Sequence, residues 1–248
     1  MEGLILRRID YGESDQIIHL FLKEKGTVAA IAKGIKRSRH RFPHRLEPFR
    51  TYDFRLAERK PGRELYLIQA ADPLQDFEEI QRDIRKIAMG NFIQEVLLIS
   101  VKEGQPHPEL YAFIVKFLRT LGGSEALIPL WFYVDIHIMR LIGFSPNFES
   151  CLKCNRPLEM GKENRFVPSG GILCPRCARK GPVAPNLVVS SASLGVLRFL
   201  KNTSLSAASR LKMTEDTRES IEKFLTDFMV YHLERPLKSL AFLREVLS

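Results

Sequence analysis

The four cysteines of this 248-residue chain lie in one short segment and are arranged as two pairs. Cys151 and Cys154 form the first Cys-x2-Cys pair, and Cys174 and Cys177 form the second, with nineteen residues between the pairs. Two intervening residues let both thiolates of a turn reach the same ion, and four thiolates make the closed tetrahedral set that structural Zn²⁺ prefers. The spacing therefore predicts a structural zinc knuckle.

Other uses of paired cysteines stay open at this level. A redox Cys-x-x-Cys needs one pair beside a βαβ pattern, whereas these pairs flank a segment rich in turn residues. An iron–sulfur cluster also takes four thiolates. Catalytic zinc keeps one position open and uses His or carboxylate ligands, which a four-cysteine set argues against. Because the cysteines cluster instead of spreading through the chain, a metal site in a reducing compartment is favoured over a disulfide framework.

A second group of candidate residues is a basic segment near the amino terminus. Residues 16–63 hold thirteen Lys and Arg against four acids, and this difference accounts for the whole net charge of +9. Positive charge concentrated in one segment suits binding to a polyanion, although a surface that is merely solvated can have the same composition. Long cationic side chains on a loop can contact successive phosphates without recognising the bases. The alternative is that the segment is a disordered charged connection. The candidate DNA-binding residues are Lys33, Lys36, Arg37, Arg39, Arg41, Arg45 and Arg50.

Two further sets of side chains bear on nucleic-acid binding. Phe42, Phe49, Tyr52 and Tyr66 are in range to stack on bases, with core packing as the alternative, which is favoured for Phe49 and for the neighbouring Phe54. Basic residues also surround the cysteine pairs, where they could contact phosphate or simply be solvated. These are Lys153, Arg156, Lys162, Arg165, Arg176, Arg179 and Lys180.

The basic segment lies among five short strand candidates. Each is apolar or alternates apolar with polar residues, and turn residues such as Gly12 and Gly26 separate them. The candidates are residues 4–6, 17–22, 27–32, 49–56 and 64–68. Five strands without a long helix predict a small closed barrel, an OB-fold, over residues 1–73.

After Asp72-Pro73 the apolar period changes from two to 3.6, as in Phe77, Ile80 and Ile84, which predicts an α-helical domain over residues 74–248. Further helical spacing is found at 109–121, 127–142, 194–200 and 221–229. The cysteine segment, residues 146–182, interrupts this domain as an insertion. The expected fold is α+β, an N-terminal five-stranded OB-fold barrel followed by an α-helical domain with an inserted four-cysteine zinc knuckle.

The sequence carries no P-loop, G-x-S-x-G, H-E-x-x-H or dinucleotide-binding glycine motif, so we expect a protein that is not an enzyme. Asp10, Glu13 and Asp15 lie close together, as nuclease carboxylates would, but a turn explains them better. A DNA-processing enzyme and an RNA-binding module remain as alternatives. No secretory signal or membrane span is expected, which predicts a cytoplasmic protein.

Five motifs follow one another in a specific order along the chain. They are Gly3-Leu4-Ile5-Leu6-Arg7 with Tyr11-Gly12-Glu13-Ser14-Asp15, Lys33-Gly34 leading into Lys36-Arg37-Ser38-Arg39, Leu46-Glu47-Pro48-Phe49, Leu141-Ile142-Gly143-Phe144-Ser145-Pro146, and Tyr231-His232-Leu233-Glu234-Arg235-Pro236-Leu237-Lys238-Ser239-Leu240. In this order they resemble the RecO family of bacterial DNA repair and recombination mediator proteins, over essentially the whole chain.

The resemblance implies binding of single-stranded and double-stranded DNA, strand annealing, and assistance to recombinase loading close to the nucleoid. The partners it implies are RecR, the tail of single-strand-binding protein and, indirectly, a recombinase. An acidic tail with an apolar end would need basic residues beside a hydrophobic groove. The carboxyl-terminal helices offer Arg198, Lys201, Arg210 and Lys212 for this purpose.

Overall fold

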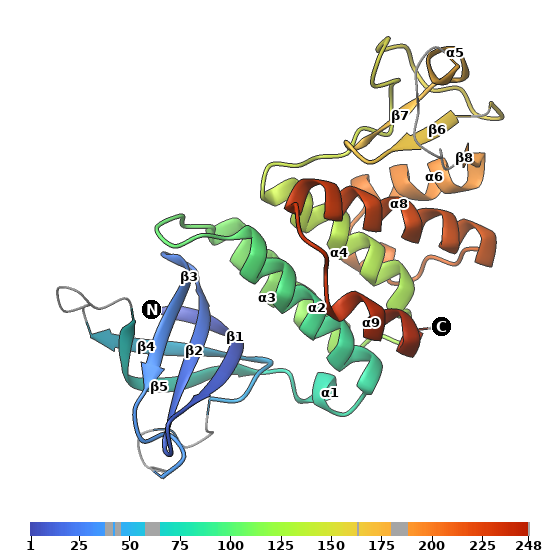
Figure 1. Cartoon of the computed structure of the whole chain (residues 1–248). Helices are drawn as coiled ribbons and strands as arrows, with labels where there is room; N and C mark the ends of the chain where they lie inside the picture. The colour runs from blue at the N-terminus through green and yellow to red at the C-terminus, as the bar shows by residue number, and fades with distance from the viewer. Residues whose placement is uncertain (38–41, 43–45, 58–64, 163, 180–187, 248) are drawn as a thin grey trace. The chain divides into compact units, whose positions relative to one another are not determined.

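The computed structural model describes residues 1–37, 42, 46–57, 65–162, 164–179 and 188–247 (Figure 1). These residues belong to two compact units, Met1–Gly123 with Leu237–Ser248, and Ser124–Pro236. Neither border falls after residue 73, where the sequence suggested a division, and that assignment of folding domains stays a prediction. In the described part of the chain, no helix combines the length and the apolar character that crossing a membrane requires.

The amino-terminal part of the first unit is a closed five-stranded barrel. Its strands are β1 (Glu2–Tyr11), β2 (Asp15–Leu22), β3 (Gly26–Ala32), β4 (Arg50–Ala57) and β5 (Tyr66–Asp76). The order is β1-β2-β3-β5-β4, with β4 pairing back onto β1 and β3 running parallel to β5. Ile5, Leu20, Val28 and Phe54 are among the buried side chains that fill it. The barrel confirms the predicted OB-type fold.

Strand β5 continues past residue 73, where the sequence suggested that the barrel ends. Pro73 pairs with Tyr52 beside a register shift in the β4–β5 ladder. Such an irregularity tolerates a residue that has no N–H to donate. The helical period that begins after Pro73 in the sequence therefore begins in the structure only after Asp76.

The described residues of the first unit also form the helices α1 (Glu78–Gln81), α2 (Ile84–Ser100), α3 (Pro108–Gly122) and α9 (Ser239–Leu247). Helix α2 is attached to the barrel at two points. The Gln94 side chain donates to the carbonyl of Ile5 at 3.0 Å. At Gly90, the ring of Phe49 occupies the space that a Cβ atom would need. Only glycine admits so close an approach.

The carboxyl-terminal helix α9 begins on a side chain of α2. The carboxylate of Glu95 accepts the backbone N–H groups of Lys238 and Ser239, at 2.9 and 2.8 Å, and also the Ser239 hydroxyl. Burial opposes ionisation of Glu95, but the hydrogen bonds from Ser239 and Lys238 outweigh it and hold the pKa of the carboxyl below its usual value of 4.5. One acidic side chain thus satisfies free N–H groups at a helix start far along the sequence.

The second unit is a helical scaffold that carries a small sheet. Its helices are α4 (Leu127–Leu141), α6 (Ser191–Asn202), α7 (Leu205–Ala208) and α8 (Glu215–Leu233). The cysteine segment adds β6 (Asn164–Val167), β7 (Gly171–Leu173) and α5 (Pro175–Ala178), and β8 (Val188–Val189), which follows the segment, pairs with β6. Phe166 of β6 stacks on Phe224 of α8 with ring centroids 4.2 Å apart, so aromatic packing holds the small sheet on α8.

We expect Gly90→Ala to lower the free energy of unfolding by about 1–3 kcal/mol, because the methyl group forces Phe49 to move. Gly195 lies inside α6 with nothing near its Cβ position. As the matched control, Gly195→Ala should be neutral or stabilise by up to about 1 kcal/mol. Urea denaturation measures both. Equal effects of the two substitutions would contradict the packing argument.

We expect Glu95→Ala to lower the free energy of unfolding by about 1–2 kcal/mol at neutral pH, since the start of α9 loses its acceptor. Because the pKa of Glu95 is lowered in the folded protein, its contribution is present above the ordinary pKa of 4.5 and is lost as the pH falls through the folded value. Denaturation series at pH 7 and below pH 4 test this, with the exposed Glu24→Ala as control. A loss that does not depend on pH would argue against the carboxylate.

Candidate functional site

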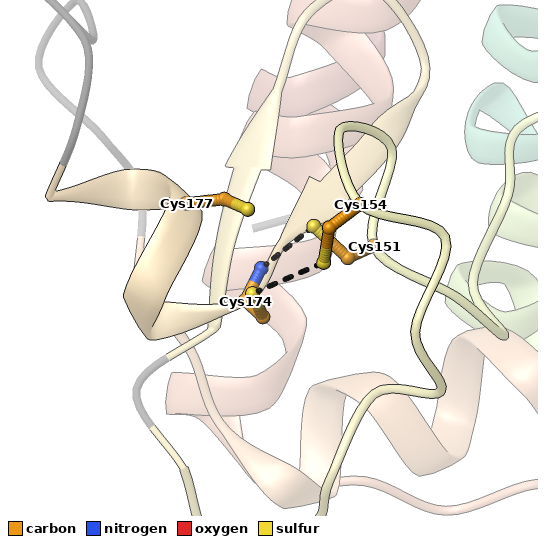
Figure 2. A group of neighbouring side chains, drawn as sticks. All are labelled: Cys151, Cys154, Cys174 and Cys177. Atoms are coloured by element: carbon orange, nitrogen blue, oxygen red, sulfur yellow. Dashed lines mark hydrogen bonds between the residues drawn. The ribbon is translucent and has the colours of Figure 1, made fainter.

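The four cysteine sulfurs form a compact cluster (Figure 2). All lie within 4.8 Å of one another, and the sulfurs of Cys154 and Cys174 are 3.8 Å apart. A tetrahedral ion with metal–sulfur distances of about 2.3 Å places its ligands about 3.8 Å apart. The donor chemistry and the spacing therefore fit a structural metal ion, and the predicted ligands Cys151, Cys154, Cys174 and Cys177 come together as a group able to bind one.

Two turns position the ligands. In the first, the backbone of Cys151 pairs with Arg156, and Asn155 adopts left-handed backbone geometry to close the turn. In the second, β7 leads into α5, with Cys174 at the residue before the helix and the N–H of Cys177 donating to its carbonyl at 3.0 Å. Leu152 N–H donates to the Ile172 carbonyl at 2.9 Å, which joins the two turns directly.

The electrostatics of the cluster favour a bound cation. Burial raises the pKa of the Cys151 thiol, but backbone N–H groups, first that of Cys174, outweigh it and bring the pKa to about 6. Burial and the neighbouring sulfurs raise the pKa of Cys177 to about 12. The first thiolate is thus stabilised by the backbone, whereas a complete set of thiolates needs a positive ion between them.

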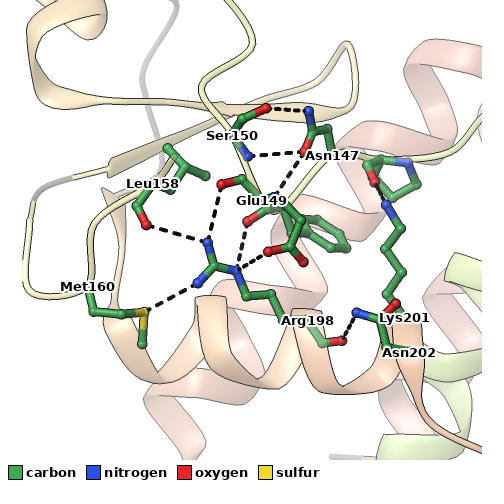
Figure 3. Close-up of polar contacts among 10 residues, drawn as sticks. Asn147, Glu149, Ser150, Leu158, Met160, Arg198, Lys201 and Asn202 are labelled. Carbon is green, nitrogen blue, oxygen red and sulfur yellow. Dashed lines mark hydrogen bonds and ion pairs between the residues drawn. The ribbon is translucent and has the colours of Figure 1, made fainter. Parts of the chain in front are cut away.

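Helix α6 fastens the start of the cysteine segment through Arg198 and Lys201 (Figure 3). The Arg198 guanidinium donates to the carbonyl of Phe148 at 2.9 Å and pairs with the carboxylate of Glu149 at 3.2 Å. Lys201 donates to the carbonyl of Pro146 at 2.7 Å and lies over the ring of Phe148. The sequence suggested Arg198 and Lys201 for docking an acidic tail. In the structure, both head groups are bonded to residues of the second unit.

The basic segment of the barrel lies beside the β1–β2 hairpin. The N–H of Gly34 donates to Asp15 at 2.8 Å, and the N–H of Lys36 donates to the carbonyl of Ser14 at 3.1 Å. The side chains of Lys33, Lys36 and Arg37 are all exposed. A basic loop and a hairpin loop are therefore fixed next to each other on the barrel.

The acidic residues of the hairpin serve as partners for these cations. Lys36 pairs with Asp10 at 2.9 Å, and Arg37 pairs with Glu13 at 3.0 Å. Hydrogen bonds from Gln16 and then Lys36 lower the pKa of Asp10, and the bond from the Gly34 N–H lowers that of Asp15. The three neighbouring carboxylates thus belong to a turn, as expected, and each has a partner within the loop structure.

Arg50 differs from the other candidates. Its guanidinium lies between Glu47 at 3.0 Å and Asp76 at 2.5 Å, and its side chain is only 12% exposed. The hydrogen bond to Asp76 is the largest cause that raises the pKa of Arg50. A DNA-binding role for Arg50 stays a prediction. Arg39, Arg41 and Arg45 lie outside the described residues.

The structure corrects the expected stacking role of Phe42 and Tyr52, and it buries Phe49, as the sequence favoured. Phe42, Phe49 and Tyr52 are buried, and the Tyr52 hydroxyl donates to the carbonyl of Glu47 at 3.2 Å. Their ring faces are covered by packing, those of Phe42 and Tyr52 in the barrel core and that of Phe49 against α2. Tyr66 is half-buried, with the Lys25 ammonium 5.1 Å from its ring centroid and its hydroxyl bonded to Glu103. Phe54 is in the core, as expected.

Comparison with known proteins identifies the family. A model described as "Recombination protein O N terminal" matches residues 1–77, and one described as "Recombination protein O C terminal" matches residues 81–241. The chain belongs to the RecO family. The DNA repair protein RecO of Geobacter metallireducens is 32% identical over 246 residues, covering 99% of this chain and 96% of that one. RecO of Anaeromyxobacter sp. strain K is 30% identical over 247 residues, with 99% and 96% covered.

Membership in the RecO family makes this chain a DNA repair protein and confirms the resemblance that the five motifs indicated. The two family models meet between residues 77 and 81, close to the end of β5. The barrel thus falls within the RecO amino-terminal match, and the cysteine cluster falls within the carboxyl-terminal match.

We expect the purified protein to hold about one Zn²⁺ per chain, and Cys154→Ser to lose the metal and lower the melting temperature by about 5–10 °C. Lys153→Ala, which keeps all four thiols in the same turn, is the control and should retain the metal. Elemental analysis with thermal unfolding measures both properties. Iron in place of zinc, or full metal content in Cys154→Ser, would count against the assignment.

Proposed function

We propose that this chain is a non-enzymatic recombination mediator that binds single-stranded and double-stranded DNA, anneals strands and assists recombinase loading on DNA coated with single-strand-binding protein. The observation that carries the proposal is the exposed basic loop with Lys33, Lys36 and Arg37 beside the β1–β2 hairpin of the barrel. In OB-type barrels, the face of the second and third strands and the loop between the first two strands bind oligonucleotides.

The ion pairs of this loop do not prevent binding. Lys36 and Arg37 pair with Asp10 and Glu13 at exposed positions, where such a pair contributes about 0–1 kcal/mol. Phosphates can therefore replace the carboxylates, and the entropy of released counterions adds to affinity. The acids of the hairpin lower the net positive charge of this surface and so weaken its nonspecific attraction for polyanions. The cations can still exchange their carboxylate partners for phosphates.

The burial of Phe42, Phe49 and Tyr52 shifts the proposed contacts from base stacking to phosphate binding. Contacts to phosphates hold a strand without sequence preference and leave the base edges free. Free base edges can pair with a second strand, which annealing requires. A barrel that sequestered bases in aromatic stacks would have to release them first.

The proposed cofactor is one structural Zn²⁺ held by the four cysteines, which supplies a cross-link between two turns and takes part in no reaction. Its support is the fit of the sulfur spacing to a tetrahedral ion. Four thiolates fill the coordination sphere, so no position is left for a substrate or an activated water.

The proposed protein partners are RecR, the tail of single-strand-binding protein and, indirectly, the recombinase, acting in the cytoplasm at the nucleoid. For the tail, a groove of about 430 Å³ in the second unit is lined by Val196, Phe199 and Met213, with the exposed Lys212 among its residues. An apolar groove with a cation beside it suits an acidic peptide with an apolar end. Arg210 is also exposed, whereas Arg198 and Lys201 are engaged elsewhere.

We expect the variant Lys33→Ala/Lys36→Ala/Arg37→Ala to bind a labelled single strand more weakly and with a salt slope shallower by about 2, at about 0.7 per lost phosphate contact. The variant Asp10→Asn/Glu13→Gln should bind more tightly than wild type, because it frees Lys36 and Arg37 and removes two negative charges. Fluorescence anisotropy across a salt series measures both.

The control for this series is Arg210→Ala/Lys223→Ala/Arg235→Ala, which removes the same charge from exposed positions of the second unit. It should change affinity much less than the loop variant. Weak binding by the wild type would refute the mediator proposal. Equal losses in the loop variant and the control would remove the loop from the binding site.

A further inference from the structure

A cavity of about 580 Å³ opens beside the cysteine cluster. Cys154, Cys174 and Cys177 contribute to its wall. The other charged residues of the wall are five cations and one acid, Lys153, Arg156, Lys162, Arg176, Arg179 and Glu159. All six are exposed, so their head groups are accessible. A concave surface with a net positive charge has the form expected of an anion-binding site.

The five cations lack the partners that the barrel cations have. Among the described residues, none of them takes part in an ion pair, whereas Lys36, Arg37 and Arg50 all do. Like charges gathered around a hollow repel one another and raise the local potential. Four thiolates around a divalent ion would offset only part of this charge. The remaining positive field has no compensating group in the described wall except Glu159.

The fold holds these cations in place from three segments. Lys153 and Arg156 come from the first cysteine turn, Lys162 from the loop before β6, and Arg176 and Arg179 from α5 and its end. The Leu152–Ile172 hydrogen bond joins the first turn to β7, just before the second cysteine pair. The side chain of Asn164, which is 2% exposed, donates to the carbonyl of Glu159 at 3.0 Å and ties Glu159 to the start of β6. With the backbone tied at these points, binding a ligand has to order chiefly the cationic side chains.

We propose that this cavity is a second nucleic-acid site, which binds the phosphates of a strand independently of the barrel loop. The inference rests on the proposed function, since it takes the ligand to be a nucleic-acid strand. The size lies within the range of about 300–1,000 Å³ that ligand sites occupy, enough for a phosphodiester with its sugar. Each compact unit then has its own phosphate-binding surface, and the cysteine cluster shapes the second one.

The test uses the full chain with the triple variant Arg156→Ala/Lys162→Ala/Arg179→Ala, whose sites lie outside both four-residue cysteine turns. Its matched control is Arg210→Ala/Lys223→Ala/Arg235→Ala, with the same loss of charge elsewhere in the same unit. For a labelled single strand, we expect the cavity variant to bind about tenfold more weakly than the control at low salt, with a slope shallower by about 2. Metal content and melting temperature should stay at wild-type values.

The outcomes separate the two proposals. If the barrel-loop variant loses affinity while the cavity variant matches its control, the cavity inference is wrong and the mediator proposal stands. If the wild type binds no strand, both are wrong. If inorganic phosphate at constant ionic strength abolishes the difference between the cavity variant and the control, the site takes a small free anion, which also overturns the strand assignment. If the triple variant loses its metal, the single variant Lys162→Glu, which alters only the loop before β6, becomes the test. It must keep its full metal content and still lose affinity for the strand.

Discussion

Four sulfurs within 4.8 Å of one another cannot all carry negative charge unless a cation joins them. This constraint bears on the meeting of two turns, the one at Cys151 and the one at Cys174, which a metal ion would cross-link. Where the turns meet, the N–H of Leu152 donates to the carbonyl of Ile172, and basic residues of both turns line the cavity. The aromatic contact between Phe166 and Phe224 then fixes the sheet to a rigid helix. Under the proposals above, the cysteines would shape the wall of the cavity and take part in no reaction.

The role proposed for the barrel poses a different physical problem, which is to hold a polyanion without holding its bases. Its interior is filled by apolar and aromatic side chains, whereas the loop beside the β1–β2 hairpin presents cations to the solvent. The cations of the loop are balanced by the acids of the hairpin, and each pair is exposed to water. Weak, exchangeable pairs keep the loop in one conformation without using up its charge. A strand bound as proposed would stay free to slide and to pair.

Features encoded by local spacing could be predicted from the sequence. The cysteine pairs, the five strands and the buried helix α4 each depend on residues a few positions apart. The expectation for Phe42 and Tyr52 failed because alternation shows which residues share a face, but not that both side chains are buried in the core of the closed barrel. The Arg50 contacts to Glu47 and Asp76 and the bonds from Lys238 and Ser239 to Glu95 could not be predicted either. They join segments whose proximity exists only after folding.

The carboxyl-terminal residues Leu237–Ser248 return to the first unit, so the second unit is an insertion within the first. This connectivity has a consequence for synthesis on the ribosome. The barrel strands emerge early, but α2 receives its neighbour α9 only after the whole second unit has been synthesised. Until then Glu95 lacks the N–H groups of Lys238 and Ser239. The first unit to begin folding is therefore also the last to be completed, and a chain that terminates early would be exposed to quality-control proteases at this point.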